Sequence, residues 1–179
     1  MTDSKSMLNV DKNIDEVDLK ILSELQKDGR LSLSELGRRV GLKHSSVRER
    51  LFKLLNKGMA KIQANINLKQ LKVNVACLAL EVANYDRVNK IIKVLESCPR
   101  TILVASTSGE YNVIALVLIE DMEALRIFIE KHIRPLSEVK KISISFGEVV
   151  YPEYFPLKPL IKFKEVNKSL CLSCNLFSR

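Results

Sequence analysis

Residues 32–58 read SLSELGRRVGLKHSSVRERLFKLLNKG, and this stretch decides the fold of the N-terminal part of the chain. Its opening SLSE is a capping box, in which the serine and the glutamate satisfy backbone N–H groups, and it predicts a short helix over residues 33–40. Gly41 breaks that helix, and a second helix over residues 44–57 is stopped by Gly58. Two short helices joined by a turn that contains glycine are typical of a helix-turn-helix.

A further helix is predicted upstream of this stretch. Apolar residues recur at helical spacing over residues 16–27, and Asp15 and Asp18 form a variant of the capping box at the start of this segment. The three helices together predict a winged-type helix-turn-helix domain over residues 13–60. Residues 1–12 are mostly polar, and we expect them to form a disordered N-terminus.

Basic residues gather in the same part of the chain. The formal net charge of the whole chain is +8. Residues 37–61 hold eight basic residues and one acidic residue, a net charge of +7, whereas residues 67–150 are nearly balanced, with eleven basic and ten acidic residues. A local excess of this kind indicates a site for a polyanion. The alternative is a basic surface that only keeps the protein in solution.

From residue 61 onward the apolar residues follow the period of a strand. They alternate with polar residues up to residue 68, which predicts a linker strand, and we assign residues 61–72 to it. Strands and helices then alternate in the order βαββαβ, over residues 74–83, 86–97, 101–107, 111–120, 122–134 and 138–150. This order is that of the ferredoxin-like motif, an antiparallel sheet with both helices on one face. We therefore expect an α+β fold with a second domain over residues 73–150.

A sheet with both helices on one face leaves its other face bare. Here that face would carry apolar side chains from the predicted strands, and an exposed apolar surface of this size usually marks an association site. We therefore expect a dimer joined sheet to sheet. The prolines of residues 151–179 exclude a long helix or a central strand, so this segment is predicted to be an irregular C-terminal extension.

Several classes of protein find no support in the sequence. No apolar run reaches the ~18 residues of a membrane helix, and the N-terminal segment lacks the apolar core of an export signal, so we expect a cytoplasmic protein with no membrane contact. The chain has no phosphate-binding glycine motif and no spacing typical of a catalytic triad. We predict no enzymatic activity, no catalytic residues and no cofactor.

The four cysteines do not form a disulfide framework. Cys77 lies in an apolar run and is expected to be buried. Cys171 and Cys174 are the one close pair, and no second pair or nearby histidine completes a zinc site, so we predict no metal centre and interpret them as a redox pair or free thiols. His132 stands near the end of a predicted helix, where it would interact with the helix dipole.

Two sets of motifs in the chain are similar to those of one known family. The first set runs through the N-terminal domain: Ile14-Asp15-x-x-Asp18, Leu25-Gln26-x-Asp28-Gly29-Arg30, Glu35-Leu36, Val40-Gly41-Leu42 and Val47-x-x-Arg50-Leu51-x-x-Leu54. The second is Ser108-Gly109-x-Tyr111-Asn112. Over about residues 13–150 the chain thereby resembles the Lrp/AsnC, or feast/famine, regulators. Lys43 departs from the family, which often has a small hydroxyl residue there, as does Asn112, where the family usually has aspartate.

The resemblance implies a sequence-specific DNA-binding transcriptional regulator. Its partners would be double-stranded DNA and a small-molecule effector, an amino acid or a related compound, bound between the second domains of neighbouring subunits. The resemblance also implies that the dimer assembles further, into a tetramer or an octamer. The effector site implied by the resemblance comprises Thr107, Ser108, Gly109, Glu110, Tyr111 and Asn112. The alternative is that these residues form an ordinary turn between strands.

The helix over residues 44–57 is expected to lie in the DNA major groove, where its first two turns reach the bases. Arg48 is placed to bind the O6 and N7 atoms of guanine, and Glu49 either accepts a hydrogen bond from cytosine or orients Arg48. Arg50 either contacts phosphate or braces the domain, and Phe52 is expected to pack rather than to contact thymine. The predicted DNA-binding residues are Arg38, Arg39, Lys43, His44, Ser45, Ser46, Arg48, Glu49, Arg50, Lys53 and Lys57.

Two other functions stay open at the level of the sequence. A non-specific architectural protein would use the basic segment equally well, because phosphate contacts carry no sequence information. Some proteins with this two-domain pattern are sirohaem decarboxylases, which would need basic and histidine side chains in the second domain. The chain has only His44 and His132, and His44 lies in the predicted DNA-reading helix.

Overall fold

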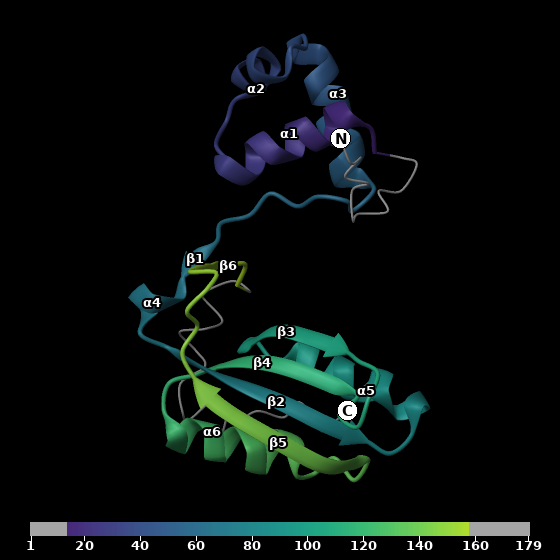
Figure 1. The fold of residues 1–179 in the computed structure, drawn as a ribbon, viewed down its shortest axis with the longest axis vertical. Coiled ribbons are helices and arrows are strands. Elements are labelled where there is room, and N and C mark those ends of the chain that lie inside the picture. The colour runs from purple at the N-terminus through teal and green to yellow at the C-terminus, as the bar shows by residue number, and fades with distance from the viewer. Residues whose placement is uncertain (1–13, 158–179) are drawn as a thin grey trace, which may run out of the picture. The chain divides into compact units, whose positions relative to one another are not determined.

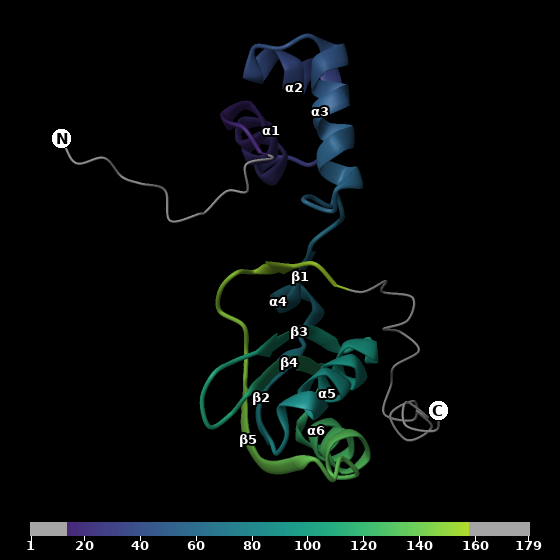
Figure 2. The same cartoon turned by 90° about the vertical axis from the view of Figure 1, so that its right-hand side faces the viewer.

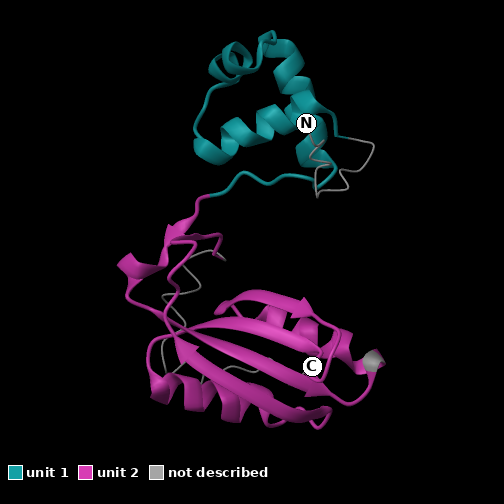
Figure 3. Ribbon diagram, viewed as in Figure 1, with its two compact units in different colours: residues 1–63 teal, residues 64–179 magenta. Residues whose placement is uncertain are grey.

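The computed structural model describes residues 14–157. The chain divides into two compact units, residues 1–63 and residues 64–179, which are described separately below (Figure 3). The predictions made for residues 1–12, and those made for Cys171 and Cys174, lie outside the described residues.

The first unit is built from helices packed around a small apolar core (Figure 1). The helices are α1 (Glu16–Lys27), α2 (Leu33–Val40) and α3 (His44–Asn56). Each helix contributes one fully buried side chain to the centre of the core: Ile21, Leu36 and Val47. Asp15 and Asp18 form the predicted capping box, since each carboxylate accepts a hydrogen bond from the other residue's backbone N–H. The predicted helices are therefore confirmed.

The capping box predicted at the start of α2 is only half formed. The Ser32 hydroxyl accepts a hydrogen bond from the backbone N–H of Glu35 at 3.1 Å. The Glu35 carboxylate, however, binds the guanidinium groups of Arg38 and Arg39 at 2.9 to 3.0 Å. A charged guanidinium is a stronger donor to a carboxylate than a neutral backbone N–H, which explains the exchange of partners.

The turn between α2 and α3 depends on two glycines. Gly41 ends α2 with φ of +74°, a left-handed conformation that favours glycine. Gly37 lies inside α2, and its carbonyl accepts a hydrogen bond from the backbone N–H of Leu42 at 2.9 Å. A Cβ atom at Gly37 would lie only 2.6 Å from the carbonyl oxygen of Leu42. The close approach of these two backbone segments therefore requires glycine at position 37.

The second unit has the predicted βαββαβ order with additional elements at its ends. Its elements are β1 (Ile66–Asn67), α4 (Leu68–Leu71), β2 (Asn74–Val82), α5 (Tyr85–Ser97), β3 (Thr101–Ser106), β4 (Val113–Ile119), α6 (Met122–Phe128), the π-helical turn η1 (Ile129–Ile133), β5 (Val139–Gly147) and β6 (Tyr154–Phe155). Within residues 64–157 the main sheet is antiparallel with the order β3-β4-β2-β5. Helices α5 and α6 lie on the same face of this sheet (Figure 2), as the ferredoxin-like motif requires.

The linker strand predicted from residue 61 is shorter than expected. Only Ile66 and Asn67 pair with another strand, β6, and the one-turn helix α4 follows at once. The Asn67 side chain caps α4 by accepting a hydrogen bond from the backbone N–H of Gln70 at 3.2 Å. The strand length predicted from the alternating pattern was wrong, because the backbone groups of a strand need hydrogen-bonding partners. Here β6 provides only two residues for pairing.

The two faces of the main sheet differ in burial. On β2, the side chains of Ala76, Leu78 and Leu80 are fully buried in the core beneath the helices. Cys77 lies between them in sequence, so its side chain is on the opposite face, where it is half-buried. The prediction that Cys77 is buried was therefore wrong. The opposite face is only partly covered: Leu118 is buried there with Leu68 and Val75, and Leu116 packs against them. Leu103 on β3 is 43% exposed.

His132 also differs from its prediction. Its side chain is buried within η1, and the imidazole packs against Phe128 in a tilted arrangement, with ring centroids 5.0 Å apart. Burial, with the positive charges of Lys131 and Arg100, lowers the pKa of His132. A buried imidazole against an aromatic ring packs in the core and does not act as a surface partner of the helix dipole.

Candidate nucleic-acid interface

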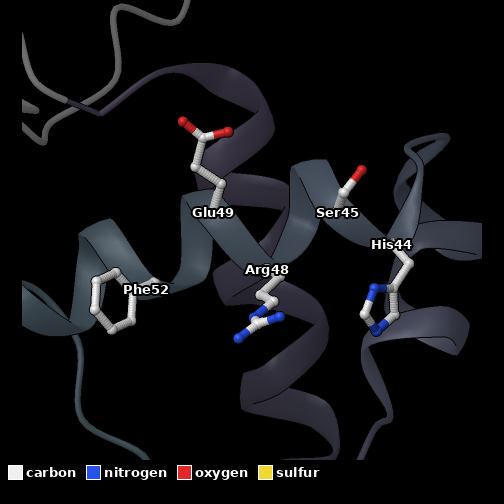
Figure 4. Close-up of a pocket in the computed structure, with 5 residues that line it drawn as sticks. All are labelled: His44, Ser45, Arg48, Glu49 and Phe52. Carbon is white, nitrogen blue, oxygen red and sulfur yellow. The ribbon is translucent and has the colours of Figure 1, made fainter.

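Helix α3 presents two different faces. Val47 and Leu54 are buried against the rest of the unit. On the other side, five exposed residues line a shallow open hollow on the surface: His44, Ser45, Arg48, Glu49 and Phe52. Figure 4 shows His44, Arg48 and Phe52 along one side of the helix and Ser45 and Glu49 along the other. The predicted base-reading residues, apart from the half-buried Ser46, thus lie together on one exposed surface.

The chemistry of this surface suits a polar, acidic partner. Arg48 carries a planar set of N–H donors, and within residues 14–157 the structure gives it no ion pair with an acidic side chain. Ser45 adds a hydroxyl group, His44 an imidazole and Glu49 a carboxylate that can accept hydrogen bonds. A helix that offers such groups over its first two turns has the geometry needed to read bases in the major groove.

Arg38 and Arg39 at the end of α2 belong to a surface ion-pair network. Arg39 binds both Glu35 and Glu24, and Arg38 binds Glu35. Hydrogen bonds from Arg38 and Arg39 lower the pKa of Glu35 to about 2. The hydrogen bond from Lys27, and then that from Arg39, lower the pKa of Glu24. Because such exposed pairs are weak, both guanidinium groups remain able to exchange a carboxylate for a phosphate.

Arg50 has a different environment from the other predicted DNA contacts. Its Nη1 atom lies 2.5 Å from Asp15 Oδ2 and 2.8 Å from Asp18 Oδ1, and the Asp18 side chain is almost fully buried. The hydrogen bond from Arg50 also lowers the pKa of Asp15. These contacts tie α3 to the start of α1, which favours the bracing role of Arg50 over a phosphate contact.

Three predicted lysines surround this surface. Lys43, Lys53 and Lys57 all have exposed side chains. Lys43 occupies the N-cap position of α3 and gives it no side-chain hydrogen bond, as expected from the replacement of a hydroxyl residue there. Ammonium groups at these positions add positive charge around the hollow, where they can meet phosphates.

Phe52 is the residue of this surface whose environment differs from the one predicted from the sequence. It was expected to pack, but its side chain is 64% exposed and lines the hollow. Its spacing from His44 and Arg48, in steps of four residues, was the signal that would have placed it on the exposed stripe.

The predicted effector turn, residues 107–112, is held by its own side chains. The Thr107 hydroxyl donates to the carbonyl of Tyr111 at 2.6 Å. The Asn112 amide accepts from the N–H of Val82 at 2.8 Å and donates to its carbonyl at 2.9 Å. Asn112 therefore fastens the turn to β2, and its amide is already engaged. Gly109 has φ of +133°, which favours glycine.

Charged groups lie beside this turn. The Lys141 ammonium on β5 is 2.7 Å from Glu110 and 3.4 Å from Glu81. The hydrogen bond from Glu110 raises the pKa of Lys141. Ser108 and Glu110 are exposed, so the turn offers a hydroxyl group, a carboxylate and backbone N–H groups to a ligand.

Both units match models of one protein family. Residues 14–55 match the AsnC-type helix-turn-helix domain, and residues 75–147 match the Lrp/AsnC ligand binding domain. The transcriptional regulator LrpC of Bacillus subtilis is 35% identical over 115 residues, which cover 60% of this chain and 80% of LrpC. The chain belongs to the Lrp/AsnC family of transcriptional regulators. The solved structure of LrpC superimposes on this Lrp/AsnC chain with a TM-score of 0.61, covering 78% of this chain and 99% of LrpC at 27% identity.

Two further proteins resemble this Lrp/AsnC regulator. Ptr1, a transcriptional regulator of Methanocaldococcus jannaschii, is 29% identical over 133 residues, 74% of this chain and 90% of Ptr1. The structure of NMB0573 from Neisseria meningitidis, a transcriptional regulator solved as a complex with L-Met, covers 84% of this chain and 99% of its own, with a TM-score of 0.66 and 24% identity. At that identity the likeness shows the fold alone.

Membership of the family identifies the Lrp/AsnC chain as a DNA-binding transcriptional regulator. These relatives are named as transcriptional regulators, so the comparisons favour neither an architectural protein nor a sirohaem decarboxylase. Within residues 14–157, no helix is both long and apolar enough to cross a membrane. The same residues hold no cluster of three or more histidine, cysteine or acidic side chains arranged to bind a metal ion.

Proposed function

We propose that two copies of this regulator read a specific DNA sequence by placing α3 of each copy in the major groove. The exposed face of α3 carries this proposal, because it joins Arg48, Ser45, His44 and Glu49 on one surface opposite the buried face. Arg48 is assigned to a guanine, which it can bind through two parallel hydrogen bonds. The other candidate base contacts are His44, Ser45, Ser46 and Glu49.

Phosphate contacts would set the position of α3 in the groove. We assign them to the basic side chains around the hollow: Arg38, Arg39, Lys43, Lys53 and Lys57. These contacts would make affinity fall with rising salt without selecting a sequence. Arg50 is excluded from this set because it is bound to Asp15 and Asp18.

Dimerisation is part of the same proposal. One helix-turn-helix reads too few base pairs for a specific site, and two half-sites about one helical turn apart require two subunits. The uncovered face of the main sheet, where Leu103 is exposed and Ile114 and Leu116 are half-buried, is the surface we assign to the dimer. Tetramers or octamers would need further contacts. A regulator of this kind acts where the DNA lies, which supports the cytoplasmic location expected from the sequence.

The second domain would bind the effector, an amino acid or a related compound, at residues 107–112 between neighbouring subunits. Three observations support this assignment: the match to a ligand binding domain, the exposed polar groups of the turn and the complex of NMB0573 with L-Met. The effector would act only through a difference in its affinity for two assemblies or two DNA-bound states.

The function is tested by titrating the full-length protein onto a labelled DNA fragment from upstream of its own gene. Excess random DNA serves as competitor, at two salt concentrations. We expect discrete complexes that survive the competitor. Equal competition by random DNA would instead support an architectural role. Amino acids including L-methionine are then added to the protein. We expect one of them to change both the unfolding temperature and the DNA affinity. If none of them changes either quantity, residues 107–112 form only a connecting turn.

A further inference from the structure

Phe52 is an aromatic side chain on an otherwise polar and charged surface. It is 64% exposed and shares its hollow with Arg48, Glu49 and two polar residues (Figure 4). Leaving an aromatic ring in water forfeits the free energy of its burial. The core of its own unit does not use it: the neighbouring Leu51, about 100° round the helix, packs against that core, whereas Phe52 does not.

The position of Phe52 on the helix matches that of a groove-reading side chain. Ser45, Arg48, Glu49 and Phe52 follow the spacing i, i+3, i+4, i+7, which keeps them on one helix face. Phe52 lies four residues, about 6 Å along the helix axis, beyond Arg48. With base pairs about 3.4 Å apart, that places its ring one or two base pairs from the base that Arg48 contacts.

The major groove offers a single type of apolar group, the C5-methyl of thymine. We propose that Phe52 contacts this methyl group and thereby selects thymine one or two positions from the guanine bound by Arg48. This inference rests on the proposed function, since it requires α3 to lie in the major groove. Phe52 would add sequence specificity to the site without adding a hydrogen bond.

The charges around Phe52 favour DNA over a protein as the occupant. Any partner that covers the ring must also cover Arg48 and Glu49, and burying unpaired charges is costly. The surrounding segment, residues 37–61, carries a net charge of +7. A duplex neutralises that charge with phosphates while its groove presents hydrogen-bonding groups to Arg48 and Glu49.

The test compares thymine with uracil, which differs only by the absence of the C5-methyl. Full-length protein first selects a binding sequence from a random DNA library, and each thymine of that sequence is then replaced by deoxyuridine in turn. We expect one thymine per half-site at which the replacement weakens binding about fourfold, the value of one buried methyl group. Phe52→Ala should bind the two DNAs equally, and Phe52→Leu should keep part of the preference.

A matched control separates this role from general binding. Lys53→Ala changes the neighbouring exposed side chain, so it should weaken binding to all sequences and lower the salt dependence while leaving the thymine-to-uracil ratio unchanged. Because Phe52 and Lys53 are exposed, neither substitution should lower the unfolding temperature of the first unit.

The possible failures are distinguishable. If the full-length protein enriches no sequence, the proposed function itself fails. If it enriches a sequence but no thymine is sensitive to uracil, or if Phe52→Ala retains the sensitivity, the methyl contact is overturned and sequence-specific binding stands. In a third outcome, Phe52→Ala lowers the molecular mass of the assembly in solution and leaves the thymine-to-uracil ratio of affinities as in the unsubstituted protein. That result would assign the ring to a contact between proteins and would also overturn the inference.

Discussion

Two arginines that are two positions apart in α3 serve different ends. Arg48 is exposed, and within residues 14–157 no acidic side chain forms an ion pair with it, whereas Arg50 binds Asp15 and the nearly buried Asp18. A helix turns about 100° per residue, so residues two apart face in nearly opposite directions. In the proposed function, the same charge therefore contributes to recognition at one position and to stability at the other.

This division predicts opposite effects of two alanine substitutions. Arg48→Ala should lower the affinity for the specific site by about 1–3 kcal/mol, the cost of losing a guanine contact, with no change in thermal unfolding. Arg50→Ala should destabilise the first unit by about 1–2 kcal/mol, because Asp18 loses its partner in a poorly solvated position. Thermal unfolding and DNA titration of both variants measure this. Arg50→Ala with unchanged stability and lost affinity would return Arg50 to the DNA contacts.

A second residue-scale prediction concerns the buried His132. Burial lowers the pKa of His132 below its usual 6.5, so the unfolded chain binds the proton more tightly than the folded chain. Stability from the neutral imidazole is thus fully present above pH 6.5 and is lost as pH falls from 6.5 toward the folded pKa. Thermal unfolding of the second unit should show this loss, and His132→Gln should reduce it. An NMR titration of the imidazole with a midpoint at or above pH 6.5 would contradict the prediction.

At the scale of elements, the sequence predicts those whose causes are local. Helix α1 follows from its capping box and α2 from Ser32, since capping involves residues three apart in the chain. The strand around β1 was predicted too long and α4 was missed, because the length of β1 is set by pairing with the two residues of β6, almost ninety residues away. The one local signal for α4 was Asn67 three residues before Gln70, a side-chain cap that the alternating pattern obscured.

The candidate site follows the same rule. The exposed face of α3 was predictable because Val47 and Leu54 fix its buried face by spacing alone. The bracing role of Arg50 depends on a contact with α1, more than thirty residues away, and could only be left as one of two alternatives. The engagement of Asn112 by the backbone of Val82 likewise requires knowledge of which strands are neighbours.

The turn between α2 and α3 supports a prediction about Gly37. A Cβ there would meet the Leu42 carbonyl at 2.6 Å, and a backbone atom cannot move aside cheaply. Gly37→Ala should therefore destabilise the first unit toward the upper end of the ~1–3 kcal/mol range for overpacking, which outweighs the ~1 kcal/mol gain in helix propensity. It should also weaken DNA binding, because α3 is displaced.

Gly29 provides the matched control for Gly37. The nearest atom to a Cβ at Gly29 is the Leu25 carbonyl oxygen at 3.8 Å, an ordinary contact. Gly29→Ala should therefore be tolerated in both thermal unfolding and DNA binding. If Gly37→Ala is as stable as Gly29→Ala, the α2–α3 turn can accommodate a Cβ atom at position 37 despite the close approach of Gly37 and Leu42.

At the scale of the whole molecule, the proposed function assigns DNA reading and assembly to different units. The reading surface lies on α3 in the first unit, but the proposed dimer surface lies on the main sheet of the second. A specific site needs two reading helices at a fixed spacing. Loss of the dimer should therefore weaken specific DNA binding even though no residue near the DNA is changed.

The two faces of the main sheet allow this dependence to be tested with one pair of variants. Leu103 on β3 is opposite Leu116 on the uncovered face and is 43% exposed, while Ile144 on β5 is opposite the buried Leu78 on the helix-covered face and is 40% exposed. Leu103→Glu places a charge in the proposed dimer interface, where its desolvation is costly. Light scattering should then show a shift toward monomer, with specific DNA affinity reduced. Ile144→Glu adds the same charge at similar exposure and should leave both unchanged. If Ile144→Glu dissociates the protein and Leu103→Glu does not, the subunits join through the edge beside α6 and not through the uncovered face of the sheet.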